Sequence, residues 1–167
     1  MLRIGIVALA VLSLVAVAQD TASPSESAIL ARVAEFHGAA GVFAVAGYRI
    51  GARALGELGE KRGSFDLDVT HRTPFQVQWS CIADGIQAAT GVSVGKLNLR
   101  LVETSPEKLE TVIRDKRSGR TLSFRLRPDF LSKYLDLPED RQAAAARELL
   151  KLPDSAIFTM RQIAKQP

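Results

Sequence analysis

Cysteine and histidine are scarce in this sequence of 167 residues, in which Cys81 is the single cysteine and His37 and His71 are the only histidines. One cysteine excludes an internal disulfide bond and leaves four roles open: a buried apolar residue, a reactive thiol, a metal ligand or an intermolecular link. The chain also lacks a nucleophile elbow, a phosphate-binding glycine loop and an HExxH pair of metal ligands. Few residues are therefore available for catalysis or metal binding.

Aromatic residues are also few, at 6% of the chain, and the net charge of +4 is modest. The densest basic region runs from Lys108 to Arg127, where Lys and Arg alternate with apolar residues and lie near Asp and Glu. This region lacks the interleaved aromatic residues on which single-stranded nucleic acids stack. We therefore expect no nucleic-acid partner and interpret these basic residues as a solvated strand face and turn.

The N-terminus has the composition of a cleavable export signal. Arg3 is the only charge before Asp20, an apolar run extends from Ile4 to Val17, and Ala16-Val17-Ala18 provides the small residues that signal peptidase requires. The run is shorter than the ~20 residues that cross a bilayer, so we expect no stable membrane span after removal of the leader. The sequence predicts a signal peptide over residues 1–18, cleavage between Ala18 and Gln19, and a periplasmic or secreted protein.

Beyond the leader, the pattern of apolar residues alternates between helical and strand periods. A short polar segment, 19–28, contains a predicted capping box from Ser23 to Glu26. Helical spacing follows over 29–36 and from Val42 to Leu58, with small residues at Gly47 and Gly51 that favour close helix packing. A later helix is predicted from about Ser80 or Cys81 to Gly91, with further helices after Pro128.

Alternation with a period of two predicts strands over 65–70, 75–79, 97–101, 109–113 and 122–126. We expect His71, which directly follows the first of these strands, to be exposed. The order of helices and strands favours an α+β fold with a mixed or mainly antiparallel sheet packed against helices. The predicted organisation is one domain with a core over 29–127 and a helical extension over 128–167.

Cys81 is predicted to lie where a helix begins. There the helix dipole and free backbone N–H groups favour a thiolate, whereas the nearby carboxylate of Asp84 disfavours it. A buried, unreactive thiol is the alternative.

Five short motifs occur in an order that resembles the FmdE (FwdE-like) family of formylmethanofuran dehydrogenase subunits. The motifs are Phe36-His37-Gly38, Gly47-Tyr48-Arg49-Ile50-Gly51, Cys81-Ile82-Ala83-Asp84-Gly85-Ile86-Gln87, Thr90-Gly91 and Gly95-Lys96-Leu97-Asn98-Leu99. The resemblance implies an α+β layer and a divalent, zinc-like metal site. It also implies two ligands: His37, which lies in a family pattern of the form FHGHxCPG, and Cys81, the cysteine before a DAIQ-like segment.

Two positions of that pattern differ in this chain. Ala39 stands where the family has its second histidine, and Gly41 stands where it has its first cysteine. Neither residue can donate to a metal, and a structural zinc site needs four protein ligands. The implied metal site is therefore incomplete.

Three hypotheses follow for an exported member of this family. In the first, it binds a metal, or a small or haem-like ligand, through His37 and Cys81, with Tyr48 and Asp84 in supporting positions. In the second, it is an enzyme with Cys81 as nucleophile or redox thiol and His37 as base. In the third, it is a structural or interaction domain. The sequence favours a protein that is not an enzyme and leaves a homodimer open. If His37 and Cys81 lie far apart, the first two hypotheses fail.

Overall fold

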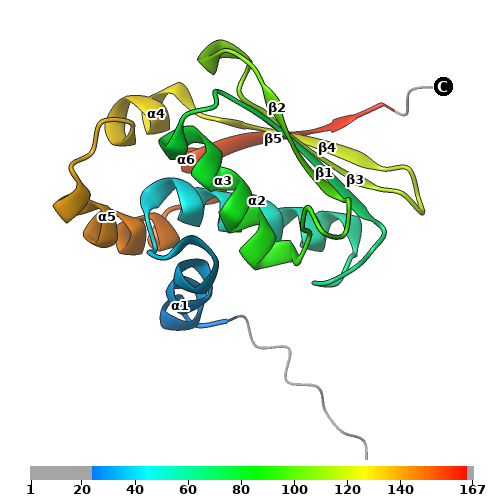
Figure 1. Ribbon diagram of the computed structural model, residues 1–167, viewed down its shortest axis with the longest axis horizontal. Helices are drawn as coiled ribbons and strands as arrows, with labels where there is room; N and C mark the ends of the chain where they lie inside the picture. Colours follow the sequence, from blue (N-terminus) through cyan, green and yellow to red (C-terminus); the bar gives the residue numbers. More distant parts are fainter. Residues whose placement is uncertain (1–23, 165–167) are drawn as a thin grey trace, which may run out of the picture.

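The computed structural model describes residues 24–164, so the predicted leader and its cleavage site at Ala18 and Gln19 lie outside the described residues. Figure 1 shows a single sheet with the helices on one of its faces. The helices are α1 (Glu26–His37), α2 (Val42–Leu58), α3 (Val77–Thr90), α4 (Pro128–Tyr134), α5 (Glu139–Lys151) and α6 (Asp154–Ile157), with a short 3-10 turn at Pro106–Lys108. The strands are β1 (Leu67–Thr73), β2 (Leu99–Glu103), β3 (Glu110–Asp115), β4 (Thr121–Leu126) and β5 (Phe158–Ile163).

The five strands form one mixed sheet in the order β2-β1-β3-β4-β5. β1 and β2 are parallel, and the other neighbouring pairs are antiparallel. α3 makes the connection between the two parallel strands, as a crossover helix does. The predicted α+β class with a mixed, mainly antiparallel sheet is confirmed.

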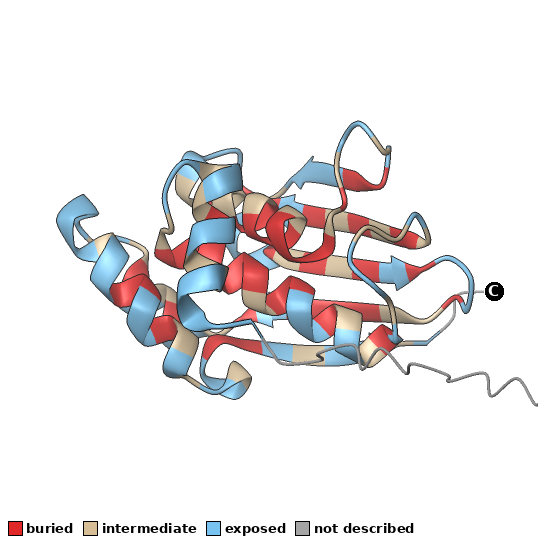
Figure 2. Cartoon of the chain, turned by 90° about the horizontal axis from the view of Figure 1, so that it is seen from below, coloured by how far each residue is buried: buried red, intermediate tan, exposed pale blue. Residues whose placement is uncertain are grey.

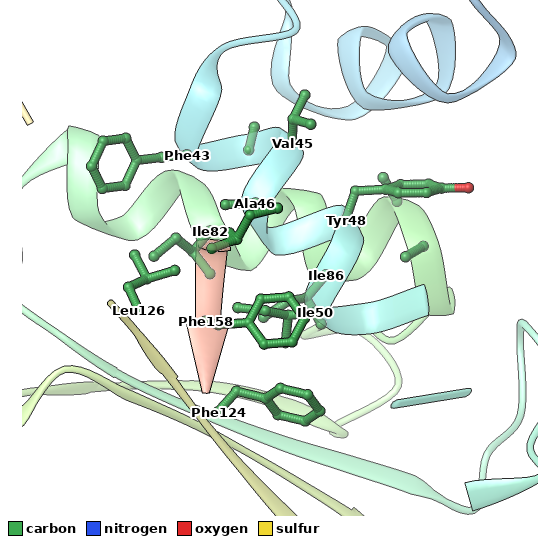
Figure 3. Close-up of a cluster of buried hydrophobic side chains, with 14 of the residues drawn as sticks. Phe43, Val45, Ala46, Tyr48, Ile50, Ile82, Ile86, Phe124, Leu126 and Phe158 are labelled. Atoms are coloured by element: carbon green, nitrogen blue, oxygen red, sulfur yellow. The ribbon is translucent and has the colours of Figure 1, made fainter. Parts of the chain in front are cut away.

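The apolar core lies between this sheet and the pair α2 and α3. Figure 3 shows Ile50, Ile82 and Ile86 of the helices above Phe124 and Phe158 of the sheet. The rings of Phe124 and Phe158 meet edge to face, with centroids 5.5 Å apart. Buried residues, coloured red in Figure 2, recur along both α2 and α3. The core therefore fixes the two helices on which most candidate site residues lie.

α2 has the bounds that the sequence predicted, because Gly59 adopts the left-handed conformation that ends a helix. The start of α1 differs slightly from the prediction. Its N-cap is Ser25, whose hydroxyl accepts a hydrogen bond from the Ala28 N–H, so the cap lies two residues after Ser23.

The predicted strand over 75–79 is wrong, because α3 already begins at Val77. Phe75 and Val77 are 60% and 80% exposed, whereas Trp79 is buried against Phe43. Five residues are too short a window to separate a strand from the first turn of a helix, and burial on α2 decides in favour of the helix.

His71 is fully buried, so the expectation that it is exposed is also wrong. It follows Leu67 and Val69 on the inward face of β1. Its ring nitrogens lie 2.9 Å from the Thr111 hydroxyl and 3.3 Å from the Trp79 carbonyl oxygen. Burial lowers the pKa of His71 to about 4, although the bond to Trp79 acts in the opposite direction.

The C-terminal segment is helical only as far as Ile157, after which β5 pairs with β4 along six residues. A strand in the predicted helical extension is thus a departure from the sequence interpretation. Arg49 of α2 bonds to the segment between α5 and α6, which precedes β5. Its guanidinium donates hydrogen bonds to the carbonyl oxygens of Leu149, Leu150 and Leu152, and to the Asp154 carboxylate at 2.6 Å.

Across residues 24–164, no single helix is long and apolar enough to span a membrane. α1 and α2 meet the length and composition criteria only together, as a pair bent by 111°.

Candidate functional site

A cavity of about 1060 Å³ opens between α1, the start of α2, the first turns of α3, and α5 with the loop before it. Most of its wall is apolar. The apolar lining residues are Leu30, Ala31, Ala34, Ala39, Ala40, Gly41, Val42, Phe43, Ala44, Val77, Leu135, Leu137 and Ala143. A volume of this size is at the upper end of the range of small-molecule sites.

Ala39 and Gly41 lie on the wall of this cavity together with His37 and Cys81. The four positions at which the family pattern would place metal ligands therefore border one space. At Gly41 a Cβ atom would meet only Oε1 of Gln142, at an ordinary distance of 3.7 Å, so the backbone leaves room for a larger side chain. The absence of ligating side chains at 39 and 41 adds to the apolar part of the wall.

His37 is the last residue of α1, and its ring faces α3. Its Nδ1 lies 2.8 Å from Oδ2 of Asp84, with the two side chains partly exposed. This contact joins the end of α1 to the middle of α3 and fixes the orientation of the imidazole ring. Asp84, predicted as a supporting residue, thus contacts His37 although it does not line the cavity.

Cys81 is the fifth residue of α3, not the first, because the helix begins at Val77. Its Sγ donates a hydrogen bond to the Val77 carbonyl oxygen at 2.7 Å. Burial raises the pKa of the thiol to about 11, and the negative charge of Asp84 adds to the effect. The predicted start of the helix at Ser80 or Cys81 is wrong, and the raised pKa keeps the thiol neutral near neutral pH, in line with the alternative of an unreactive thiol.

Tyr48, the other predicted supporting residue, lies on α2 outside the cavity wall. Figure 3 shows its hydroxyl pointing away from the cluster of core side chains around Ile50. Burial raises its pKa, opposed by the positive charges of Arg32 and Arg62. The structure brings His37, Cys81 and Asp84 together and leaves Tyr48 apart from them.

Sequence reasoning missed the part of the wall that comes from residues 135–147. Gln142 of α5 accepts a hydrogen bond from the Val42 N–H at 3.1 Å and donates one to the Leu137 carbonyl oxygen at 3.0 Å. Arg147 lies on the same wall. These residues are about 100 positions from α2 in the chain, and no local pattern marks them as neighbours of His37.

The residues present do not fit the divalent metal that the resemblance implies. Within residues 24–164, no group of three or more His, Cys, Asp and Glu side chains is placed to hold a metal ion. His37 and Cys81 supply two donors at most, and the Cys81 sulfur is a neutral thiol bonded to a backbone carbonyl. Four ligands complete a structural zinc site, so this pair is too small a set.

The fold and the cavity define an α+β domain with a small-molecule-sized space beside its helices. The model of the family described as FmdE, molybdenum formylmethanofuran dehydrogenase operon, matches residues 36–159. This chain belongs to the FmdE family.

Its structure is similar to the crystal structure of a tungsten formylmethanofuran dehydrogenase FmdE-like protein from Syntrophus aciditrophicus. The TM-score is 0.57 at 19% sequence identity, and the match covers 87% of this chain and 75% of that chain. This likeness shows a shared fold. No curated protein matches the sequence.

Proposed function

We propose that this FmdE-family protein is a non-catalytic binding protein that acts outside the cytoplasm and holds a small, mainly apolar molecule in the cavity beside His37. The cavity itself carries the proposal, because its volume suits such a ligand and most of its lining residues are apolar. Export is supported by the composition of residues 1–18, with their charged start, apolar run and small residues before Gln19.

Most polar side chains of the cavity wall are already bonded to the protein. Gln78 donates to the Tyr134 carbonyl oxygen, Gln142 is bonded at both ends, and the Cys81 thiol donates to Val77. A ligand need not form hydrogen bonds to polar groups that are already satisfied in this way. An apolar ligand that covered unsatisfied polar groups would bind with less favourable free energy. The wall therefore favours a molecule with an apolar body.

His37 provides the polar contact in this proposal. Its Nδ1 is engaged by Asp84, which leaves Nε2 as the ring atom that can bond a ligand. One hydrogen-bonding group at that nitrogen would orient an otherwise apolar molecule. A metal is disfavoured by the two missing donors at Ala39 and Gly41, and a thiol enzyme by the raised pKa of Cys81.

The proposal is tested with the neutral fluorescent probe N-phenyl-1-naphthylamine and a variant that fills the cavity. Ala34→Phe places a ring in the cavity wall, and Ala52→Phe places the same ring on the exposed side of α2 as a matched control. We expect saturable fluorescence enhancement in the wild type and in Ala52→Phe. Binding to Ala34→Phe should be at least about tenfold weaker, because the new ring takes the space in which a ring of the probe would be buried, and burial of that ring contributes more than about 1.4 kcal/mol to binding. Equal binding by all three proteins would refute the proposal.

A second experiment separates ligand binding from metal binding. The double variant Ala39→His/Gly41→Cys restores the donors of the family pattern at positions where the structure has room. We expect stoichiometric zinc by elemental analysis in this variant and sub-stoichiometric zinc in the wild type. Stoichiometric zinc in the wild type, lost in Cys81→Ser, would instead support a metal site.

Export is tested separately by expressing the whole chain and measuring the mass of the purified protein. We expect the mass of residues 19–167, and we expect Ala18→Tyr to block cleavage because signal peptidase requires a small residue there. An intact N-terminus on a cytoplasmic wild-type protein would contradict this part of the proposal.

A further inference from the structure

The face of the sheet opposite the helices is uncovered in the described part of the chain (Figure 1). Side chains alternate across a strand, so the residues between the buried positions point to this face. The charged residues among them are the arginines Arg72, Arg100, Arg114, Arg125 and Arg161 and the acids Asp68 and Glu110. Five positive charges against two negative ones give this face an excess of three positive charges.

Glu110 is the centre of one arginine cluster. Its carboxylate accepts a hydrogen bond from the Ser123 hydroxyl at 2.6 Å and lies 3.4 Å from Arg125, 3.7 Å from Arg161 and 4.0 Å from Arg72. One carboxylate can neutralise one guanidinium, so the cluster keeps a positive charge. Arg72, at the longest distance, is the arginine that Glu110 holds least closely.

Arg114 is the second positive group, and its guanidinium makes no ion pair or hydrogen bond with any residue from 24 to 164. Its cross-strand neighbour is Asp68. That carboxylate is already bonded to Arg100 at 2.7 Å, which leaves Arg114 without it.

Arg72 and Arg114 line the same cavity, which has a volume of about 350 Å³ and lies on this open face. Val112 lies between them along β3, and Thr121 of β4, opposite Arg114, pairs in turn with Ile163 of β5 on the far side of the cavity. The guanidinium group is planar and presents paired donors that match the oxygens of phosphate. The Glu110 carboxylate lines the same cavity, but two guanidinium groups leave the lining with a net positive charge, which suits an anion better than a neutral ligand.

We propose that this cavity is a second binding site, for a phosphate group carried by a small molecule or a lipid headgroup, with Arg72 and Arg114 as its ligands. The site lies on the opposite side of the sheet from the apolar cavity beside His37 and is independent of the function proposed for that cavity. Glu110, 4.0 Å from Arg72, offsets part of the repulsion among the neighbouring arginines.

The test is calorimetric titration of the purified chain with sn-glycerol 3-phosphate, with glycerol as the uncharged reference. Arg114→Gln and Arg72→Gln each remove one proposed ligand, and Arg141→Gln removes an exposed charge from α5 as the matched control. We expect each of the first two variants to bind about tenfold more weakly, since a charged hydrogen bond contributes at least about 1.4 kcal/mol, and Arg141→Gln to bind like the wild type.

The two sources of phosphate are distinguished by co-sedimentation with phosphatidylglycerol vesicles and phosphatidylcholine vesicles. Binding to the anionic vesicles alone, lost in Arg114→Gln, assigns the site to a lipid headgroup; binding of the soluble ester without vesicle binding assigns it to a small molecule. Arg114→Lys, which keeps the charge and loses the paired donors, serves as a second variant and should bind with intermediate affinity. Absence of binding to both probes, or an equal loss in Arg141→Gln, would overturn the proposal.

Discussion

Small residues line two regions of this molecule with opposite results. Between α2 and α3, Gly47 and Gly85 allow the helix backbones to touch: a Cβ atom at Gly47 would collide with the Ile82 carbonyl oxygen, and one at Gly85 with the Ala44 carbonyl oxygen. At the cavity, Ala39 and Gly41 line an open space instead, and a Cβ atom at Gly41 would meet only Oε1 of Gln142, at 3.7 Å. Small residues therefore leave no space between the two helix backbones in the first region, whereas in the second they border a cavity of about 1060 Å³.

A small residue thus permits the close approach of two helices but does not cause it. α2 and α3 are drawn together because both are buried over most of their length against the sheet. Val33 is the one buried residue of α1, so the burial of apolar surface draws α1 against α5 much less strongly. The cavity is open where the driving force for burial is weak.

The largest effect is expected from adding one methyl group to the packed region. Gly85→Ala places a Cβ against backbone atoms of α2 that cannot rotate away, so we expect a loss of about 3 kcal/mol or more in the free energy of unfolding, or no folded protein. Urea denaturation followed by circular dichroism measures this. An unchanged midpoint would show that the two helices lie farther apart than in this structure.

The second prediction concerns His71, the histidine that belongs to the packed region. The pKa of His71 is lowered from 6.5 to about 4, so the unfolded chain binds a proton that the folded chain does not between these values. Stability from this group is therefore complete above pH 6.5 and is lost as the pH falls toward 4, by about 3 kcal/mol.

Urea unfolding at about pH 7 and about pH 4.5 checks this prediction, with His71→Asn as the variant. We expect a smaller loss of stability on acidification in His71→Asn than in the wild type. The same pH dependence in both proteins would show that His71 is not responsible.

The third prediction concerns the thiol at the edge of the cavity. A rise in the pKa of Cys81 from 9.0 to about 11 lowers its thiolate fraction at pH 8 about 100-fold, and the thiolate is the reactive form. We expect alkylation by iodoacetamide to be slow at pH 8 relative to the urea-unfolded chain and to accelerate as the pH rises toward 11. In Asp84→Asn the alkylation should be faster, since a negative charge is removed. Rapid alkylation of the wild type at neutral pH would make Cys81 a candidate nucleophile again.

The smallest effect is expected where a helical glycine faces open space. A Cβ atom at Gly56 of α2 meets nothing within 4 Å. Gly56→Ala should therefore stabilise the protein by about 0.5–1 kcal/mol, because alanine loses less backbone entropy in a helix. The thermal midpoint reports this, and a loss of stability would mean that this end of α2 is more crowded than the structure shows.

Local pattern predicted much of the fold. The bounds of α2 follow from helical spacing and Gly59, and the faces of β3 and β4 follow from strict alternation. The errors fall where local signals conflict with partners that are distant in the chain. Residues 75–79 alternate like a strand, but α3 begins at Val77 because Trp79 packs on Phe43. Phe158–Ile163 becomes a strand because it pairs with the edge of β4.

The candidate site was predictable only in part. His37 and Cys81 were found from their chemistry and from the family resemblance, and the structure places both on one cavity. The contact of His37 with Asp84 and the wall contributed by Gln142 depend on how α1, α3 and α5 meet, and no spacing in the sequence encodes that.

The amino-acid sequence sets which chemical groups the protein has: one thiol, two histidines, no metal donor at positions 39 and 41, and more Lys and Arg than Asp and Glu. Only the tertiary structure decided what each residue does. It buried His71, kept the Cys81 thiol neutral, and set Arg114 beside a cavity without a partner among residues 24–164. The physical reason is that pKa, pairing and accessible volume depend on surroundings built from segments far apart in the chain.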